Sequence, residues 1–379
     1  MNRRTFLLNS AATAGSLGLA STAVARDSQG AAASATPTWD MPSRKLLVID
    51  GCGGIAAQDL PLKPELLREC LDSGVTAFNW TVSQGSFEDT VENIAFVQAL
   101  AAGDPEHFIL VRRHSDIARA RQARAIGLIM GFQDASTVEP DLDRIDTFYR
   151  LGVRIIQLTY NNRGLYGDGC LEPGNAGLSK LGRAAVERMN ALGVAVDLSH
   201  CGQRTTADGI EASKKPALIT HAGCAAVHPH PRNKEDRELK ALADRGGVVG
   251  IYFMPYLVAS PTSPAREHVI AHLDHALKVA GANHVGIGTD GSLNTVPDTP
   301  EQRKRIQEEM DRRKKLGVAA PEEDRPPYSP DLNTTRRLEI IADGLQKKGY
   351  SAEVVENVLG NNFNRALGEI WKDPAAVNA

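Results

Sequence analysis

Residues 178–221, LSKLGRAAVERMNALGVAVDLSHCGQRTTADGIEASKKPALITH, carry the pattern on which the fold prediction rests. Two amphipathic stretches, Leu178–Leu192 and Thr205–Lys214, predict helices. Two short apolar runs, Val194–Ser199 and Ala217–Thr220, predict strands that are buried on both faces. Helix and strand therefore alternate, which is typical of βαβ units in a parallel sheet.

The same alternation continues on both sides of this stretch. Six further short runs predict strands: Lys45–Asp50, Gly74–Trp80, Ala125–Phe132, Val153–Thr159, Gly247–Phe253 and His284–Thr289. Eight parallel strands with helices between them, such as Ser263–Ala280, match a closed (β/α)₈ barrel of the TIM type. Phe108–Val111 is a ninth candidate, which could form a side strand. A doubly wound open sheet is disfavoured, because no Gly-x-Gly-x-x-Gly motif follows the first strand.

The N-terminal residues predict an exported protein. The pair Arg3-Arg4 precedes an apolar, alanine-rich stretch that closes on the cleavage pattern Ala23-Val24-Ala25. These features are typical of a signal peptide over residues 1–25, and the paired arginines indicate the twin-arginine export machinery as a partner. An uncleaved membrane anchor is the alternative, but the stretch is short and diluted with Ser, Thr and Gly. We therefore expect the protein in the periplasm or in another exported location.

The remaining residues predict a leader and one domain. Residues 26–40 are expected to form a flexible leader, and residues 41–379 a single barrel domain. Without residues 1–25, 41 basic residues face 46 acidic ones, a formal charge of −5, which argues against nucleic acid as a partner. The five cysteines are an odd number, so at least one is expected to stay unpaired, to bind metal or to pair between chains.

A charged segment at about residues 296–330 breaks the alternation. Pro, Glu, Lys and Arg dominate it, and Glu301–Lys315 predicts a solvated helix. One interpretation is a surface insertion. The other is a lid, because an insertion after the eighth strand emerges at the catalytic face of a barrel. The sequence leaves both interpretations open.

Polar residues follow the predicted strands at the end where a parallel barrel has its mouth. They are Asp50-Gly51-Cys52, Gln133-Asp134, Tyr160-Asn161, His200-Cys201, His221 and Asp290. A lone histidine after an apolar strand is more often a hydrogen-bonded core residue than a ligand. His200 and His221 follow adjacent strands, however, and this favours a divalent metal. Two histidines with one carboxylate suit zinc and also suit iron.

Three further polar features each have functional and structural interpretations. Asp290 in Thr289-Asp290-Gly291 could be a metal ligand, a general base or part of a turn, and its place at a strand end favours function. The loop His228-Pro229-His230-Pro231 could bind metal, although an exposed His-Pro loop is commoner. Arg232 could bind a carboxylate in a bidentate manner or form an ordinary surface ion pair.

Several motifs occur in a fixed order between about Leu46 and Ala366. They are Gly177-Leu178-Ser179-Lys180-Leu181-Gly182, Val196-Asp197-Leu198-Ser199-His200, Ser213-Lys214-Lys215-Pro216, Thr220-His221, His230-Pro231-Arg232-Asn233, Gly246-Gly247-Val248-Val249, His284-Val285-Gly286-Ile287-Gly288-Thr289-Asp290, Gly349-Tyr350-Ser351 and Leu359-Gly360-Asn361-Asn362-Phe363. This string resembles the membrane (renal) dipeptidase family, a branch of the amidohydrolase superfamily. The resemblance implies a metal-dependent hydrolase barrel over residues 41–379, a dipeptide or related small molecule as substrate, and a homodimer.

The resemblance also implies roles for individual residues. Family members hold two zinc ions bridged by a glutamate and hydrolyse dipeptides. His200 and His221 match the ligands of the second metal. Arg232 matches the arginine that holds the C-terminal carboxylate of the substrate, and Asp290 matches the acid that handles the proton.

Four positions depart from the family pattern. The family begins with Asp-Gly-His-x-Asp, whose His and Asp bind the first metal, but Cys52 and Gly54 stand at these positions. Gln133 replaces the bridging glutamate, and Tyr160 replaces a histidine that stabilises the reacting carbonyl oxygen. Two cations a few ångströms apart need anionic ligands to offset their repulsion. We therefore expect one zinc ion rather than two, with iron as the alternative metal and with Gln133 and Cys52 as optional ligands.

Three functional hypotheses follow from this set of residues. In the first, a mononuclear enzyme hydrolyses dipeptides or related small amides, with Asp290 as base and with Tyr160 binding the substrate as oxyanion donor. In the second, the barrel acts on another peptide-derived small molecule. In the third, it is a catalytically silent binding protein. Independently of these, Cys52 could bind zinc as thiolate or act as a nucleophile next to His200.

Overall fold

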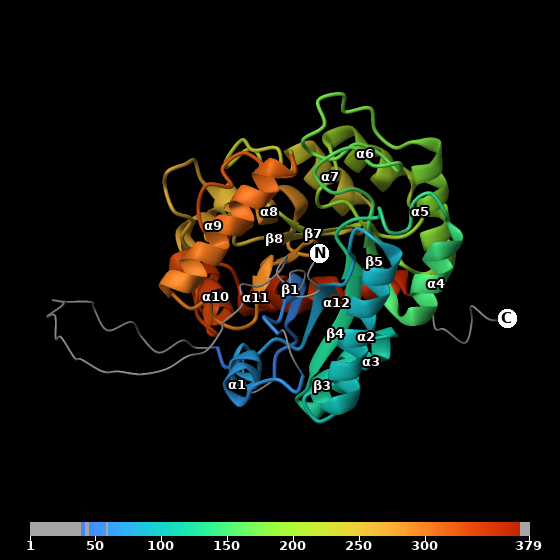
Figure 1. Ribbon diagram of the computed structural model, residues 1–379. Helices are drawn as coiled ribbons and strands as arrows, with labels where there is room; N and C mark the ends of the chain where they lie inside the picture. The colour runs from blue at the N-terminus through green and yellow to red at the C-terminus, as the bar shows by residue number, and fades with distance from the viewer. Residues whose placement is uncertain (1–38, 42–44, 58–59, 372–379) are drawn as a thin grey trace, which may run out of the picture.

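A closed barrel of eight parallel strands forms the centre of the computed structural model, which describes residues 39–41, 45–57 and 60–371 (Figure 1). The barrel strands, in the order of their pairing, are β1 (Ile49–Gly54), β2 (Ala77–Thr81), β4 (Ile126–Phe132), β5 (Val153–Gln157), β6 (Ala195–Asp197), β7 (Leu218–Ala222), β8 (Val248–Ile251) and β9 (Val285–Ile287). Asp50 of β1 pairs with Ile287 of β9, and this contact closes the ring. The (β/α)₈ prediction is confirmed. The predicted signal peptide, residues 1–25, and most of the predicted leader lie outside the described residues.

Two short strands lie beside the barrel. β3 (Phe108–Leu110) pairs with β4 as the predicted side strand. β10 (Gly291–Ser292) pairs with Gly53 and Gly54 at the end of β1, and the sequence did not predict it. Because of this pairing, β1 continues four residues beyond Asp50, where the sequence predicted its end. Cys52 therefore lies within a strand, and not in the loop that follows one.

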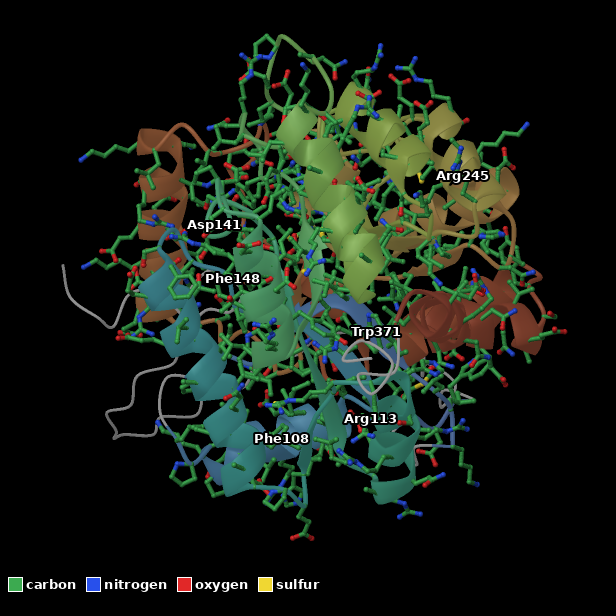
Figure 2. The ribbon with its side chains drawn as sticks, turned by 90° about the vertical axis from the view of Figure 1, so that its right-hand side faces the viewer. Phe108, Arg113, Asp141, Phe148, Arg245 and Trp371 are labelled. Carbon is green, nitrogen blue, oxygen red and sulfur yellow. The ribbon has the colours of Figure 1, made fainter. Side chains whose placement is uncertain are left out.

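Helices cover the outside of the barrel, as the two views show (Figures 1 and 2). They are α1 (Pro64–Asp72), α2 (Phe87–Gly103), α3 (His114–Ala123), α4 (Asp143–Leu151), α5 (Lys180–Leu192), α6 (Gln203–Ala212), α7 (Asp236–Asp244), α8 (Arg266–Ala280), α9 (Pro300–Lys315), α10 (Arg337–Lys347), α11 (Ala352–Glu356) and α12 (Asn362–Ile370). Two 3₁₀ turns, η2 (Pro255–Leu257) and η3 (Pro330–Leu332), and a π-helical turn, η4 (Asn357–Asn361), complete the set. In the part of the chain that is described, no helix combines the length and the apolar character needed to cross a bilayer.

Aromatic and aliphatic side chains fill the space between strands and helices. Phe148 of α4, labelled in Figure 2, is fully buried and packs edge-on against Phe132 of β4, with ring centroids 4.9 Å apart. Such edge-to-face pairs stabilise a core by roughly 0.5–1.5 kcal/mol beyond the burial of their area. This packing holds the end of β4, and with it Gln133, at a fixed place in the mouth.

A second apolar cluster fills the lower end of the barrel, away from the mouth. α12 contributes Phe363, whose ring lies against the strands. A β-carbon on Gly51 or on Gly286 would come within 2.7 Å or 2.5 Å of that ring. Glycine at these two positions therefore makes room for the aromatic plug. With the lower end closed, the carboxyl ends of the strands are the open face on which a site can form.

Candidate metal and catalytic site

His200 and His221 meet at the mouth of the barrel. His200 follows β6, and His221 lies inside β7, one residue before its end. Both side chains are buried, and their Nε2 atoms are 2.9 Å apart. Tetrahedral zinc with Zn–N bonds of about 2.0–2.1 Å holds two nitrogen ligands roughly 3.3 Å apart. The pair of imidazoles thus has a spacing close to that of two ligands of one ion.

The hydrogen-bond network determines which ring nitrogens carry hydrogen. Asn161 donates from Nδ2 to the carbonyl of Val318 (2.8 Å), so its Oδ1 is the atom that faces Nδ1 of His200 at 2.6 Å. His200 is therefore protonated at Nδ1, and its Nε2 keeps a lone pair. Burial lowers the pKa of His200 well below its ordinary value, which keeps the ring neutral.

His221 is arranged in the same way by a different partner. Thr220 donates its hydroxyl hydrogen to Asp197 Oδ2 (2.6 Å), so its oxygen accepts from Nδ1 of His221 (2.9 Å). Burial also lowers the pKa of His221. Two neutral imidazoles therefore direct lone pairs at each other. Such an arrangement is repulsive unless a cation lies between them, and this donor set fits a divalent metal.

Cys52, Asp290 and Gln133 form the opposite side of the mouth. Ligand atoms of Cys52, His221 and Asp290 all lie within 4.8 Å of one another. Gln133 donates from Nε2 to Cys52 Sγ (2.9 Å) and to Asp290 Oδ1 (3.2 Å), and the Cys52 thiol lies 3.5 Å from the same Oδ1. Burial, reinforced by the charge of Asp290, raises the pKa of Cys52 well above its ordinary value. Gln133 thus brings a neutral amide, and not a carboxylate, to the place of a bridging ligand.

Asp290 reaches this cluster through an unusual backbone conformation. Its φ is +56°, in the left-handed region, and its N–H donates to the carbonyl of Cys52 at 2.8 Å. Asp tolerates this conformation better than most residues. This conformation points the carboxylate at Cys52 and Gln133, and the chain continues directly into β10 at Gly291. The contacts of the carboxylate therefore favour the functional interpretation over the turn.

Tyr160 and Arg232 occupy different places relative to the histidines. Tyr160 stacks on His200, with centroids 4.2 Å apart and planes inclined by 23°. Arg232 is only 1% exposed and donates to the carbonyls of Ser199 (2.6 Å) and His221 (3.4 Å). The guanidinium thus supports the backbone of both histidine segments. Binding of a substrate carboxylate by Arg232 remains a prediction from the sequence.

A cavity of about 180 Å³ lies between the mouth and the charged insertion. The barrel lines it with Gln133, Tyr160, His200 and Asp290, whereas Arg232 is not among the lining residues. α9 lines it with Gln302, Arg305, Ile306, Glu309, Met310 and Arg313. The insertion therefore covers the mouth, which favours the lid interpretation over an independent surface insertion. Arg313 was not predicted as a site residue, since no local pattern separates it from the other charges of α9.

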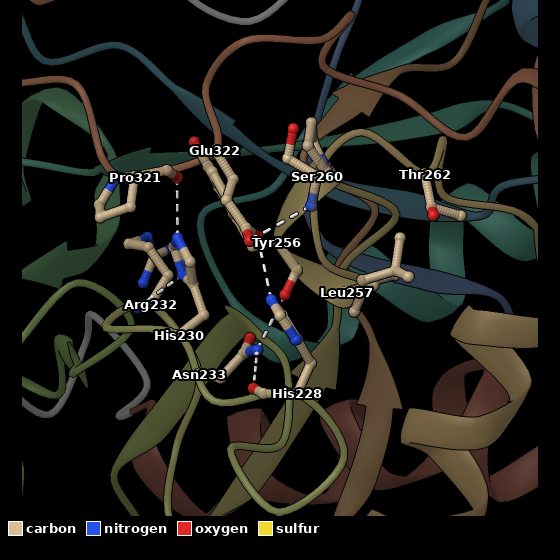
Figure 3. Close-up of polar contacts among 12 residues, drawn as sticks. His228, His230, Arg232, Asn233, Tyr256, Leu257, Ser260, Thr262, Pro321 and Glu322 are labelled. Carbon is tan, nitrogen blue, oxygen red and sulfur yellow. Dashed lines mark hydrogen bonds and ion pairs between the residues drawn. The ribbon is translucent and has the colours of Figure 1, made fainter.

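The His-Pro loop fastens the insertion to the barrel (Figure 3). His228 Nε2 pairs with Glu322 Oε2 at 3.0 Å, and His230 Nε2 donates to the carbonyl of Pro321 at 2.9 Å. His230 is 6% exposed and stacks on Tyr256 with centroids 4.6 Å apart. The interpretation as an exposed loop is therefore wrong for His230. Both histidines therefore contact residues of the insertion, His228 through Glu322 and His230 through Pro321.

Comparison with known proteins links this chain to one family of enzymes. The family model described as membrane dipeptidase (peptidase family M19) matches residues 64–315. The dipeptidase tcpJ of Claviceps purpurea is 26% identical over 81% of this chain, and the dipeptidase verJ of Clonostachys rogersoniana is 33% identical over 54% of it. The chain spans 65% and 53% of the lengths of these two relatives. The crystal structure of an amidohydrolase from Pseudomonas aeruginosa superposes with a TM-score of 0.77 at 31% identity, over 88% of this chain and 98% of its own.

Proposed function

Because the chain belongs to the membrane dipeptidase family, peptidase family M19, we propose that it is a metal-dependent hydrolase of dipeptides or related small amides. The observation that carries the proposal is the pair of Nε2 atoms of His200 and His221, which lie 2.9 Å apart beside the cavity at the barrel mouth. When bound there, a divalent ion such as zinc supplies Lewis acidity, which activates water for attack on an amide carbonyl. His200 and His221 would hold it, with Asp290 or Cys52 as a further ligand.

Asp290 is the proton carrier in this proposal. Its Oδ1 already accepts from Gln133, which leaves Oδ2 for the proton of the attacking water. As the C–O bond forms and the C–N bond breaks, Asp290 would take that proton and deliver it to the leaving amine. The carboxylate lines the cavity in which the attacking water and the leaving amine would lie.

Tyr160 is the oxyanion donor in this proposal. Its oxygen accepts a hydrogen bond from Arg313, so its own hydrogen is available to the carbonyl oxygen of a substrate in the cavity. A donor placed where negative charge develops typically accounts for about 10²–10³ in rate. The stacked ring of His200 keeps Tyr160 beside the metal-binding nitrogens.

We propose that the site holds one ion, with zinc as the first candidate and iron as the alternative. Next to Asp290, the side that would hold a second ion presents the Gln133 amide, whose Nε2 donates to Cys52 Sγ and Asp290 Oδ1. A neutral amide brings no negative charge to offset the repulsion between two cations, as a bridging carboxylate would. We further propose export to the periplasm through the twin-arginine route, on the basis of Arg3-Arg4 and Ala23-Val24-Ala25.

The proposed function is tested with a panel of dipeptides, including D-residues at the C-terminal side, and with metal-stripped protein. Hydrolysis is expected to be lost after chelation and to return when zinc or iron(II) is added back. Amidated dipeptides serve as the comparison for recognition of a free carboxylate. Full activity after complete metal removal would contradict the proposal, and so would a lack of hydrolysis across the panel by the metal-loaded protein.

A further inference from the structure

Arg313 stands apart from the other charged residues of α9. Its side chain is 18% exposed, whereas that of its neighbour Arg312 is 42% exposed and pairs with Glu309 within the same helix. Arg313 instead points into the cavity at the barrel mouth. A buried guanidinium is costly unless its N–H groups are paired, so the partners of Arg313 define what it does.

Glu323 holds Arg313 in one orientation. The guanidinium donates from Nε and Nη2 to the two carboxylate oxygens of Glu323, at 2.6 Å and 2.7 Å. Glu323 also accepts from the Tyr256 hydroxyl (2.6 Å) and from the N–H of Ala320 (3.0 Å). Burial alone would raise the pKa of Glu323, but the hydrogen bonds and charge of Arg313 bring it below its ordinary value. The pair is thus charged on both sides and bidentate, a geometry that restricts rotation.

The remaining edge of the guanidinium meets Tyr160. Arg313 Nη1 donates to the Tyr160 hydroxyl at 3.0 Å, across 153 residues of sequence. Because the phenol oxygen accepts from a fixed cation, its C–O–H rotor is no longer free. Its hydrogen has to point away from Arg313, and Tyr160 itself lines the cavity together with His200 and Asp290. The charge of Arg313 also lowers the pKa of the phenol, although burial keeps that pKa above its ordinary value.

We infer that Arg313, oriented by Glu323, is a positioning residue that aims the Tyr160 O–H at the carbonyl oxygen of the substrate, so that the insertion completes the oxyanion site of the barrel. This inference rests on the proposed hydrolytic function. According to this inference, the insertion not only covers the mouth but also contributes a residue that positions a catalytic group. Arg313 itself would not touch the reacting atoms.

The test is a double-mutant cycle on Arg313 and Tyr160, measured on the metal-loaded full chain with a dipeptide that the wild type hydrolyses. Tyr160→Phe removes the donor, and kcat is expected to fall about 100-fold. Arg313→Met leaves the donor free to rotate, and kcat is expected to fall roughly 10-fold with KM nearly unchanged. In the Tyr160→Phe background, Arg313→Met is expected to cause no further loss of kcat, because the hydroxyl through which it acts is gone.

Two other variants separate positioning from folding of the insertion. Arg313→Lys keeps a cation near the hydroxyl and is expected to recover part of kcat. Glu323→Gln keeps the shape of the pair but loosens it, so its loss is expected to be smaller than that of Arg313→Met. Arg312→Met is the matched control, one residue away on the same helix, and should behave as wild type. Thermal unfolding of every variant shows whether the fold has been kept.

The binding of a phosphinate dipeptide analogue gives a readout that does not depend on turnover. Its tetrahedral phosphorus carries oxygens that resemble the oxyanion, so Arg313→Met is expected to weaken its binding about 10-fold. Binding of an amino-acid product, whose carboxylate is planar, is expected to be spared. Equal losses of kcat from Arg313→Met in the presence and absence of the Tyr160 hydroxyl would overturn the inference. The inference would also be overturned if Arg313→Met lowered kcat no more than Arg312→Met does. If the wild type hydrolyses no dipeptide, the proposed function fails and the inference falls with it.

Discussion

The two sides of the barrel mouth are built from different chemistry. At the ends of β6 and β7, two imidazoles have their outer nitrogens fixed by Asn161 and Thr220, and their inner nitrogens face each other at 2.9 Å. At the ends of β1 and β4, a thiol and a neutral amide hydrogen-bond to each other and to Asp290. On the imidazole side, two lone pairs face each other with no hydrogen between them, so a cation would be stabilised there. On the thiol and amide side, the polar groups are hydrogen-bonded to one another.

This difference supports the proposal that the barrel holds one metal ion and not two. Lone pairs with no hydrogen between them need a cation, and fixed outer hydrogen bonds hold them ready for one. On the other side, the neutral amide of Gln133 already donates a hydrogen bond to Asp290. A second ion would have to displace that amide and would find Gly54 where the family pattern has a carboxylate. Variants of His221 and Thr220 test the imidazole side of the mouth, and restoration of the family residues tests the thiol and amide side.

The largest effect is expected from His221→Ala, which removes one of the two facing nitrogens. Metal binding should be lost, and hydrolysis should fall by roughly 1,000-fold or more, since losing even an outer partner of a ligand typically costs 10–100-fold. Metal content and kcat/KM are the measurements. The matched control is His275→Ala, because His275 pairs with Asp236 at the surface. A variant that retains metal and rate would show that the imidazole pair is not the metal site.

A smaller effect is expected from Thr220→Val, which keeps the imidazole but removes the acceptor of its Nδ1 hydrogen. Without that acceptor the ring can turn and change tautomer, so metal affinity should fall about 10–100-fold. Competition with a chelator measures the affinity. Thr90→Val, the same change at another buried threonine far along the chain in α2, is the control. Equal metal affinity in Thr220→Val and Thr90→Val would argue that Thr220 does not fix the tautomer of His221.

The opposite side can be tested by restoring the residues of the family pattern. The triple variant Cys52→His, Gly54→Asp, Gln133→Glu supplies two carboxylates and an imidazole where the wild type has a thiol, no side chain and an amide. Metal content is expected to rise by one equivalent per chain, because the two anionic ligands offset the repulsion between the ions. Gln133→Glu alone lacks the other ligands and should bind no extra ion. If the triple variant bound no additional metal, the three substituted residues would not be what limits the chain to the one ion that we propose.

The smallest effect concerns the anchor of the insertion and not the mouth itself. Burial lowers the pKa of His230 to about 4, from 6.5. Between these values the unfolded chain binds more protons than the folded one, so this contribution to stability is complete above pH 6.5 and is lost as the pH falls towards 4. His230→Gln should remove about 1 kcal/mol of the pH dependence of unfolding between about pH 6.5 and 5.5. An unchanged dependence would mean that His230 is not buried in neutral form.

The alternation of apolar runs and amphipathic stretches was enough to predict the barrel and the meeting of His200, His221 and Asp290 at one end. Strand order in a parallel barrel follows the chain, so residues at strand ends converge by topology. The π-helical turn and the short β10 could not be predicted, because each depends on a few residues and on distant packing.

The partners of the site residues were mostly beyond the reach of the sequence. Asn161 was noted only for its place after a strand, although it fixes the tautomer of His200. Arg313 is one of many charges on α9, and its contact with Tyr160 joins residues 153 positions apart. Such contacts depend on how an insertion settles on the mouth, which no local pattern encodes. Arg232, in contrast, was recognised from its motif, but its depth beneath the histidines was not foreseen.

The most direct test of the whole account is the metal content of the wild-type chain, isolated from the compartment where it matures and analysed for zinc and iron. The account predicts one equivalent per chain, falling to none in His221→Ala. Two equivalents bound by the unaltered chain would contradict the proposal that Gln133, Cys52 and Gly54 do not supply the ligands for a second ion.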